Sequence, residues 1–152
     1  MNLSLTDLEE NQSQPHVPIN SNNALIETAV NAIGDADITF VLDGGGVALT
    51  TGVKLDIPVD FACTIVAATL LADQSGSIVL DLWKDTYANF PPTGADSICA
   101  SAKPTLSAAV KAKDTTLTGW TTSIAAGDIL RLNVDSVSTV TRVTLALKVK
   151  KV

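Results

Sequence analysis

Residues 81–98, with the sequence DLWKDTYANFPPTGADSI, concentrate the side chains of this chain that could bind a ligand or do chemistry. They include one of the two tryptophans, the only tyrosine, a Pro-Pro pair and three aspartates. Carboxylates can act as acid–base pairs or as ligands of a hard cation, and aromatic rings offer flat apolar faces for stacking. The segment is therefore an active site, a ligand-binding lip or a long structural loop.

The carboxylates of this segment form no recognisable catalytic pair or metal loop. Asp81 and Asp85 would share a strand face about 13 Å apart, beyond the roughly 5–9.5 Å between glycosidase acids. Asp73, Asp81, Asp85 and Asp96 lack the D-x-[DN]-x-[DN]-G register of a calcium loop. We expect neither an acid pair nor a metal here, although acids on neighbouring strands remain a second source of such a pair.

Other catalytic constellations are scarce in the sequence. His16 is the only histidine and lies in a proline-flanked segment, so a Ser-His or Cys-His couple would require that segment to fold back over a site. Gly44, Gly45 and Gly46 lack the GxGxxG spacing of a dinucleotide loop. Cys63 and Cys99 have no CxxC spacing, which favours two buried thiols. We predict a protein that is not an enzyme, with no catalytic residue, no metal and no cofactor.

The aromatic side chains allow two interpretations: a platform for sugars, or packing anchors at one end of a β domain. Aromatic residues make up only 4% of the chain, which is sparse for a module that stacks on sugars. Packing is therefore favoured for Trp83 and Trp120. We predict that a proline-stiffened contact loop is formed here, with sugar binding as the alternative. Its residues are Trp83, Tyr87, Phe90, Pro91 and Pro92.

Composition and charge restrict the class of protein. Hydrophobic residues make up 46% of the 152 residues and charged residues 17%, enough to build one packed domain. The net charge of −6 argues against a nucleic-acid partner. No apolar run approaches the roughly 18 residues of a membrane helix, and no signal peptide is visible, so we expect synthesis in a cytoplasm and no membrane contact.

The N-terminal region differs from the rest of the chain. Residues 1–53 contain seven acids and no Lys or Arg, which is typical of a solvated tail or of a segment that docks on a basic surface. Residues 1–22 are predicted to form an extended arm, because Pro15 and Pro18 disfavour helix. A short helix is predicted over residues 22–34, with Gly34 at its end. Its apolar stripe consists of Leu25, Ile26, Ala29, Val30 and Ile33.

Strand and turn patterns begin at Asp35. Strands are predicted at residues 38–43 and 47–50 around the glycine triplet, then at 61–72, at 77–85 after a turn at 73–76, at 128–136 and at 139–150. Residues 105–114 fit a short helix or a bent strand. The sequence thus predicts residues 1–34 as an arm with one helix, and residues 35–152 as a mainly β domain, an antiparallel β-sandwich or jelly roll.

Several motifs carry a resemblance that spans about residues 38–150. They are ADQSGSIVLDLWKD, FPPT followed by DSI, LTGWTTSIAAGDIL, and a terminal V-x-L-x-L-K-V strand. Together they resemble a module found in virion structural proteins of tailed bacteriophages. The resemblance implies a compact β-sandwich or jelly-roll domain that sits on tail proteins, on head fibres or on capsids, often as a trimer.

An arm followed by a single β domain looks more like a capsid decoration (cement) protein than like a fibre, because no shaft pattern precedes the module. This resemblance implies a homotrimer on the virion surface, bound to the major capsid protein or another virion protein, with the helix stripe at the oligomer interface. A head-fibre or tail-tip module that binds host carbohydrate is the alternative. The capsid contacts expected from the arm are Leu3, Leu5, Leu8, Pro15, His16, Val17, Pro18 and Ile19.

Overall fold

A computed structural model describes Ala24, Ile26 and residues 34–152 of the chain. The chain divides into two units, Met1–Ile33 and Gly34–Val152. Ala24, Ile26 and Gly34 have helical backbone, but the other residues of the predicted helix lie outside the described residues, so the helix stays a prediction. Within the described part of the chain, no helix is long and apolar enough to cross a membrane.

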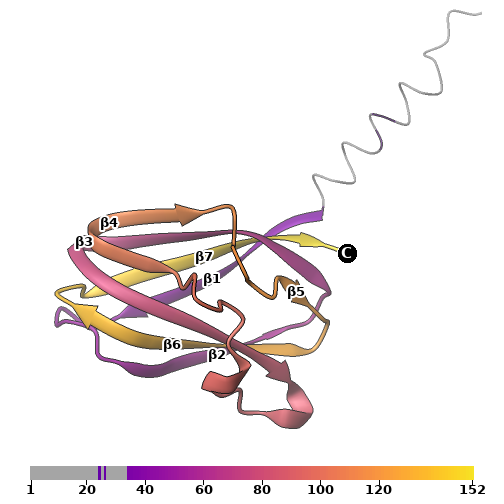
Figure 1. Ribbon diagram of the computed structural model, residues 1–152, viewed down its shortest axis with the longest axis horizontal. Helices are drawn as coiled ribbons and strands as arrows, with labels where there is room; N and C mark the ends of the chain where they lie inside the picture. Colours follow the sequence, from indigo (N-terminus) through magenta and orange to yellow (C-terminus); the bar gives the residue numbers. More distant parts are fainter. Residues whose placement is uncertain (1–23, 25, 27–33) are drawn as a thin grey trace, which may run out of the picture. The chain divides into compact units, whose positions relative to one another are not determined.

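Strands are the main regular structure of the unit from Gly34 onward (Figure 1). Two short 3₁₀ turns, η1 (Tyr87–Asn89) and η2 (Gly94–Asp96), follow the longest strand. The strands are β1 (Asp35–Asp43), β2 (Gly52–Val59), β3 (Cys63–Thr86), β4 (Thr105–Asp114), β5 (Ser123–Ile124), β6 (Asp128–Ser138) and β7 (Arg142–Lys151).

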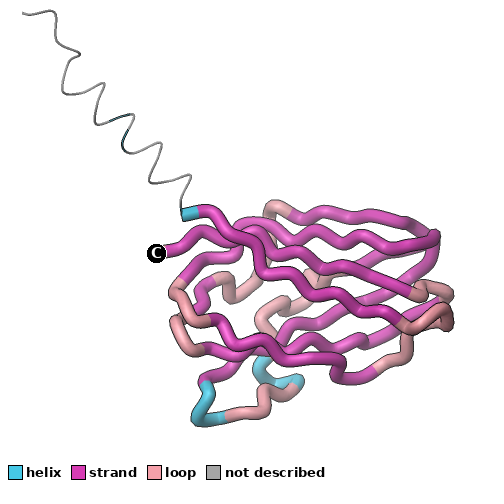
Figure 2. Tube along the Cα trace, turned by 180° about the vertical axis from the view of Figure 1, so that it is seen from behind, coloured by secondary structure: helices cyan, strands magenta, loops and turns pink. Residues whose placement is uncertain are grey.

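All seven strands belong to one antiparallel sheet that curls into a half-barrel (Figures 1 and 2). Its order is β1-β7-β3-β6-β2, with β4 and β5 also paired to β3. Residues 63–72 of β3 pair with β7, whereas residues 77–86 of the same strand pair with β6. One strand thus belongs to both halves of the sheet.

The two halves are called wings below. The β1–β7 wing comprises β1, β7, residues 63–72 of β3 and residues 111–114 of β4. The β2–β6 wing comprises β2, β6, residues 77–86 of β3 and residues 105–109 of β4. Because β3 and β4 continue from one wing into the other, the wings are connected by unbroken backbone.

Gly76 marks the bend between the wings. A Cβ atom at this position would lie 2.6 Å from Thr139 Oγ1 and 2.8 Å from the Ser138 carbonyl oxygen, so only glycine permits the approach. The strands beside it bend as well, since Thr139 and Ala108 have φ of +68° and +49°. The β3–β4 register also shifts on both sides of Gly76, as expected of bulges that curve a sheet.

Hydrogen bonds to the Asp73 side chain stabilise the bend. Its carboxylate accepts hydrogen bonds from the Thr141 hydroxyl and from the Arg142 backbone N–H, the latter at 2.9 Å. These bonds, the one from the Thr141 side chain first, lower the pKa of Asp73 below its ordinary value of 3.8. The polar residues at 73–76 therefore hold a continuous strand in a bent course.

The core lies between the inner faces of the two wings. Side chains of β1 alternate, with Ile38, Phe40 and Leu42 buried while Thr39 and Val41 are exposed. Leu, Ile and Val supply the matching positions on the other strands, and each such buried side chain contributes about 2 kcal/mol. The largest fully buried side chains are Phe40, Ile65, Leu70, Ile78, Leu80, Leu82, Leu106, Ile124, Leu130, Leu132, Leu145 and Leu147.

Two strand-level predictions are wrong. Residues 47–50 are a loop, because the tight turn at Gly44–Val47 leads the chain from one wing to the other and β1 never pairs with β2. Residues 73–76 are part of β3, because their polar groups stabilise a bend and not a reversal. Residues 105–114 form a strand. The mainly β, antiparallel class is confirmed, and the sandwich or jelly-roll form stays a prediction.

Candidate functional site

Residues 81–98 cover the outer face of the β2–β6 wing. Leu80 and Leu82 point into the core, so Asp81 and Trp83 lie on the opposite face. The chain then returns over that face, where Ser97 forms a β-bridge with Trp83 and the Ile98 N–H donates to the Leu82 carbonyl at 2.9 Å. The segment is thus a strand end and the loop that folds back on it.

Trp83 is packed beneath this loop. An added Cβ on Gly94 would lie 3.6 Å from Cζ2 of the indole, which is ordinary contact. The Trp83 Nε1 atom is buried and has no hydrogen-bond partner among the described residues. Trp120 is also buried, and its Nε1 donates to the Ala102 carbonyl at 2.8 Å. Trp120 is a buried packing residue, and Trp83 is half-buried against the loop.

Arg131 holds the loop against the sheet. Its guanidinium donates to both oxygens of Asp56, at 2.6 and 2.8 Å, and to the Pro92 carbonyl at 3.2 Å. It also lies 5.2 Å from the centre of the Phe90 ring. The hydrogen bonds to Asp56 raise the pKa of Arg131. One side chain of β6 therefore connects the edge strand β2 to the tip of the loop.

Asp81 is the buried centre of a polar network. It is 3% exposed, accepts from Ser97 Oγ at 2.6 Å, and lies 2.9 Å from Lys103 Nζ. Lys103 also contacts Asp135 at 2.7 Å, and the two carboxylates, Asp135 first, raise the pKa of the lysine. An ammonium held by two carboxylates is no general base, and an ion-paired carboxylate is a poor activator of Ser97. The network fastens the returning chain.

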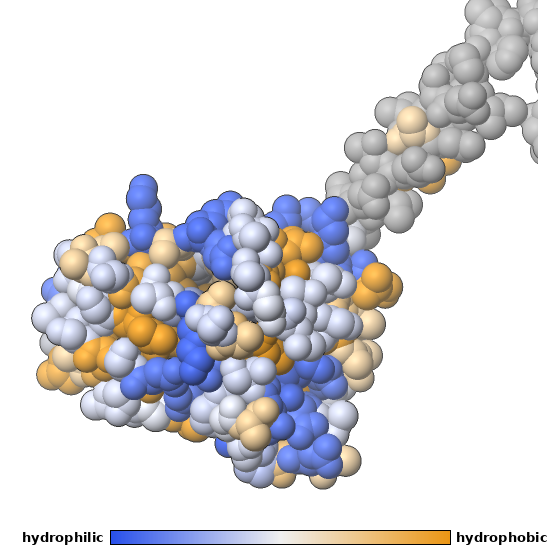
Figure 3. Space-filling view, in the orientation of Figure 1, coloured by the Kyte–Doolittle hydropathy of each residue, from blue (hydrophilic) through white to orange (hydrophobic). Residues whose placement is uncertain are grey.

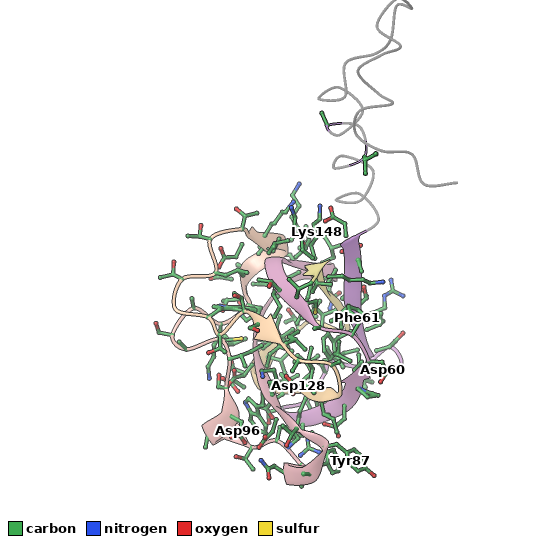
Figure 4. All side chains as sticks on the ribbon, turned by 90° about the vertical axis from the view of Figure 1, so that its right-hand side faces the viewer. Asp60, Phe61, Tyr87, Asp96, Asp128 and Lys148 are labelled. Carbon is green, nitrogen blue, oxygen red and sulfur yellow. The ribbon has the colours of Figure 1, made fainter. Side chains whose placement is uncertain are left out.

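Asp128 is the second buried carboxylate, labelled in the end view of Figure 4. Its Oδ2 lies 2.8 Å from Lys84 Nζ and accepts from the Ala125 N–H at 2.9 Å. This closes the turn between β5 and β6. Like Asp81, it has a structural set of partners and no neighbouring nucleophile among the described residues.

The two cysteines are buried free thiols. Burial raises the pKa of Cys99 to about 12 and also raises the pKa of Cys63. Neither is a thiolate at neutral pH, so neither is a nucleophile. Among Ala24, Ile26 and residues 34–152, no three His, Cys, Asp or Glu side chains form a group that could hold a metal.

No protein-family model matches the chain, and no curated protein is significantly similar to it.

The tip of the loop presents aromatic and polar groups to solvent. Tyr87 is 80% exposed and Phe90 49% exposed. Figure 4 shows Tyr87 at the far end of the loop, and Figure 3 shows mainly hydrophilic residues gathered there. Pro91 is exposed and Pro92 is buried. The predicted contact loop is thus divided: Trp83 and Pro92 support it from within, and the other three residues face outward.

The remaining predicted contacts are largely untested. Ile26 is described and is 60% exposed, whereas the other residues of the helix stripe lie outside the described part of the chain. The same holds for every predicted capsid contact of the arm: Leu3, Leu5, Leu8, Pro15, His16, Val17, Pro18 and Ile19.

A pocket of about 240 Å³ opens beside β4, between Ala68 and Leu70 on one side and Ala102 and Pro104 on the other, with Trp120 in its wall. Its volume lies below the 300–1,000 Å³ usual for small-molecule sites. Alanine side chains leave this space, and Lys103, Thr105, Lys113 and Asp114 also line it.

Sequence reasoning missed the outer face of the β1–β7 wing. Val41 and Leu71 are 55% and 49% exposed there, in strands whose inner faces belong to the core. The alternation of β1 already places Thr39 and Val41 outward, but nothing in the sequence indicates that this face stays uncovered while that of the β2–β6 wing is covered.

Proposed function

We propose that this protein is a non-enzymatic structural component of a tailed-phage virion, a capsid decoration protein. Its N-terminal arm binds the major capsid protein, and its β domain, a sandwich or jelly roll in form, stabilises the head as a homotrimer on the virion surface. The motifs within residues 38–150 that resemble phage virion modules support this assignment.

The observation that carries the non-enzymatic part is the saturation of the candidate site. Asp81, Lys103 and Arg131 each have charged partners within 2.9 Å. Lys103 fastens the returning chain to β3 and β6, and Arg131 joins β6 to β2 while donating to the Pro92 carbonyl of the loop. Side chains that are ion-paired in this way stabilise a rigid surface and are not available for acid–base chemistry. A rigid surface is what a protein that reinforces a shell requires.

The alternative, a head-fibre or tail-tip module that binds host carbohydrate, is favoured by a single observation. Tyr87 projects from the loop with 80% of its surface exposed, next to the half-exposed Phe90. Exposed rings on a stiff loop suit stacking on a sugar.

The test is localisation in virions of the phage that encodes the chain. Antibody labelling in electron microscopy is expected to decorate the head surface; labelling of the tail tip would favour the alternative, and absence from virions would contradict both.

Attachment is tested with the full chain carrying Leu3→Asp, Leu5→Asp and Leu8→Asp, which should lose binding to isolated heads. A matched control, Val152→Asp at a position that is 91% exposed, should retain it. If the protein is instead a carbohydrate-binding fibre or tail-tip module, Tyr87→Ala should abolish glycan binding and leave the fold intact.

A further inference from the structure

Strand β4 forms a free edge of the sheet (Figure 1). It pairs with β3 on one side, and no described strand pairs with it on the other. Unpaired backbone N–H and C=O groups along such an edge can hydrogen-bond to an extended segment of another chain. The β4 edge is therefore a surface to which a partner strand can be added.

The edge carries two lysines on its outer side. Lys111 and Lys113 are exposed, and the register with β3 places both on the outer face of the sheet. They are two residues apart, about 7 Å along the strand. Neither has an ion-pair partner among the described residues. Two unpaired ammonium groups on one edge repel a basic strand and favour an acidic one.

A pocket lies on the inner side of the same edge. Ala112, between the two lysines, is opposite the buried Leu70 of β3 and therefore faces inward. It lines the pocket of about 240 Å³ whose facing wall contains Ala102, Pro104 and Trp120. That volume is small for a separate ligand but suits one apolar side chain. A strand added to β4 directs one side chain toward this pocket, between two side chains that face the lysines.

The neighbouring charged groups do not neutralise the two lysines. Asp114 faces inward, and its Oδ1 accepts from the Thr116 N–H at 2.8 Å in the turn that follows β4. Asp73 is hydrogen-bonded to residues 141–142. Lys103, in the pocket wall, is held between two carboxylates. The surplus charge of this edge is therefore positive and lies on its outer side.

The sheet of a second copy is a poor partner for this edge. Antiparallel pairing of β4 with β4 of another copy sets Lys111 against Lys113, and like charges directly opposite are unfavourable. The acids of β1 are already balanced within the chain. Asp35 lies 2.9 Å from Lys148 Nζ, and Asp37 is opposite the same lysine in the register with β7. The complementary strand must come from elsewhere.

We propose that the β4 edge binds an extended acidic segment of another protein by strand addition. The segment runs antiparallel to β4, with an Asp or Glu opposite each lysine and an apolar side chain between them that enters the pocket beside Ala112. The order acid, apolar, acid selects the partner, because it satisfies the outer and the inner side of the edge together. This binding does not depend on the proposed role in a virion.

The probe is the end-blocked synthetic peptide Thr-Thr-Asp-Leu-Glu-Thr-Thr, titrated into the full chain and followed by NMR. We expect saturable shifts of backbone amides in β4 and the pocket wall, and slower amide exchange at residues 110–114. The matched control peptide, Thr-Thr-Leu-Asp-Glu-Thr-Thr, has the same composition but places its acids on opposite faces of a strand. It should bind about tenfold more weakly.

Charge reversal tests the lysines. The variant Lys111→Glu with Lys113→Glu should bind the acidic peptide about tenfold more weakly and should bind Thr-Thr-Lys-Leu-Lys-Thr-Thr instead. The matched control, Arg142→Glu with Lys150→Glu, makes the same charge change on the same outer face. These residues lie on β7, which is paired on both sides, so the affinity should be unchanged.

Filling the pocket tests its role separately. Ala102→Leu adds side-chain volume to the wall that faces Ala112. It should weaken binding of the Asp-Leu-Glu peptide about fivefold. Binding of Thr-Thr-Asp-Ser-Glu-Thr-Thr should not change, because its serine has no apolar group to bury. Circular dichroism checks that each variant is folded.

Absence of saturable binding to the wild-type chain, equal binding of the two isomeric peptides, or indifference to lysine reversal would overturn the proposal. The isomeric peptides are compared on the wild-type chain, so the test holds even where a variant fails to fold. Binding that appears only after Asp7→Lys with Glu9→Lys would make the acidic residues of a second copy the occupant, and would also overturn it. Absence of the protein from virions contradicts the proposed function alone.

Discussion

The two wings of the half-barrel share β3 and β4 and a common core, yet their outer faces are opposites. On the β2–β6 wing, Asp81, Trp83 and Arg131 point outward and are covered by the 87–97 loop. On the β1–β7 wing, Thr, Ala and single apolar side chains point outward between charged residues of β1, β4 and β7, and Val41 and Leu71 are about half exposed. The residues with the richest chemistry are thus occupied within the chain, on the wing that the 87–97 loop covers.

The difference teaches how buried charge is used here. A carboxylate that loses water must gain strong partners, and Asp81 gains both a hydroxyl and an ammonium. Such a set fixes one geometry of the returning loop. The Thr and Ala side chains on the outer face of the β1–β7 wing need no such partners. Substitutions that remove a charged partner on the outer face of the β2–β6 wing should destabilise the fold. Substitutions on the outer face of the β1–β7 wing should leave stability unaltered.

Asp81→Ala should produce the largest effect. It leaves the Ser97 hydroxyl without its acceptor and Lys103 with Asp135 alone. We expect a loss of about 2 kcal/mol in the free energy of unfolding, below the usual 3–5 kcal/mol because Lys103 is about a third exposed. Urea denaturation measures it. The control on the outer face of the β1–β7 wing, Asp37→Ala, should cost less than about 0.5 kcal/mol; equal costs at the two sites would contradict the comparison.

Arg131→Lys should have an intermediate effect. Lysine keeps the charge but loses the two-point contact with Asp56 and the bond to Pro92. We expect about 1 kcal/mol less stability and faster amide hydrogen exchange confined to the 87–97 loop. Arg142→Lys, at an exposed position of the β1–β7 wing, is the control and should leave exchange unchanged. Uniform acceleration over the sheet would show that Arg131 does not act through the loop.

Acid below about pH 3.8 should produce the smallest effect, again on the covered wing. Hydrogen bonds from the Thr93 backbone and hydroxyl lower the pKa of Asp96 below its ordinary value of 3.8. Its contribution is therefore fully present above that value and is lost as the pH falls through the lower, folded value. Carboxyl chemical shifts in an NMR titration should show this, and the η2 turn of an Asp96→Asn variant should lack the pH dependence. An Asp96 that titrates at 3.8 would contradict it.

Much of the sheet is predictable from the sequence, because strict alternation determines which side chains enter the core. Leu130, Leu132 and Val134 of β6, and Val143, Leu145 and Leu147 of β7, are buried as their pattern predicts. The bend at residues 73–76 is not predictable from the sequence, since such polar residues are compatible with either a chain reversal or a bend within one strand. Only the approach of Thr139 to Gly76 distinguishes the two.

The candidate site is predictable only in its location. The proline-rich loop and its aromatic residues stand out in the sequence, and the parity of Asp81 and Trp83 follows from strand period. Their partners do not follow, because Lys103 and Arg131 come from later segments whose pairing to β3 is a property of the whole sheet. An aspartate that looks catalytic in the sequence is revealed as structural only by those partners.

The strand order has a consequence for how the chain folds. β1 pairs only with β7, and β2 only with β6. The first two strands of the β domain therefore cannot form their sheet pairings until the last two have been synthesised. On a ribosome, Phe40 and its buried neighbours have no sheet to join until the last strand has left the exit tunnel. Such non-local pairing makes folding slow and leaves an apolar intermediate exposed to aggregation. Completion of the sheet is therefore a late event, which leaves time for a chaperone to act on the unfinished chain.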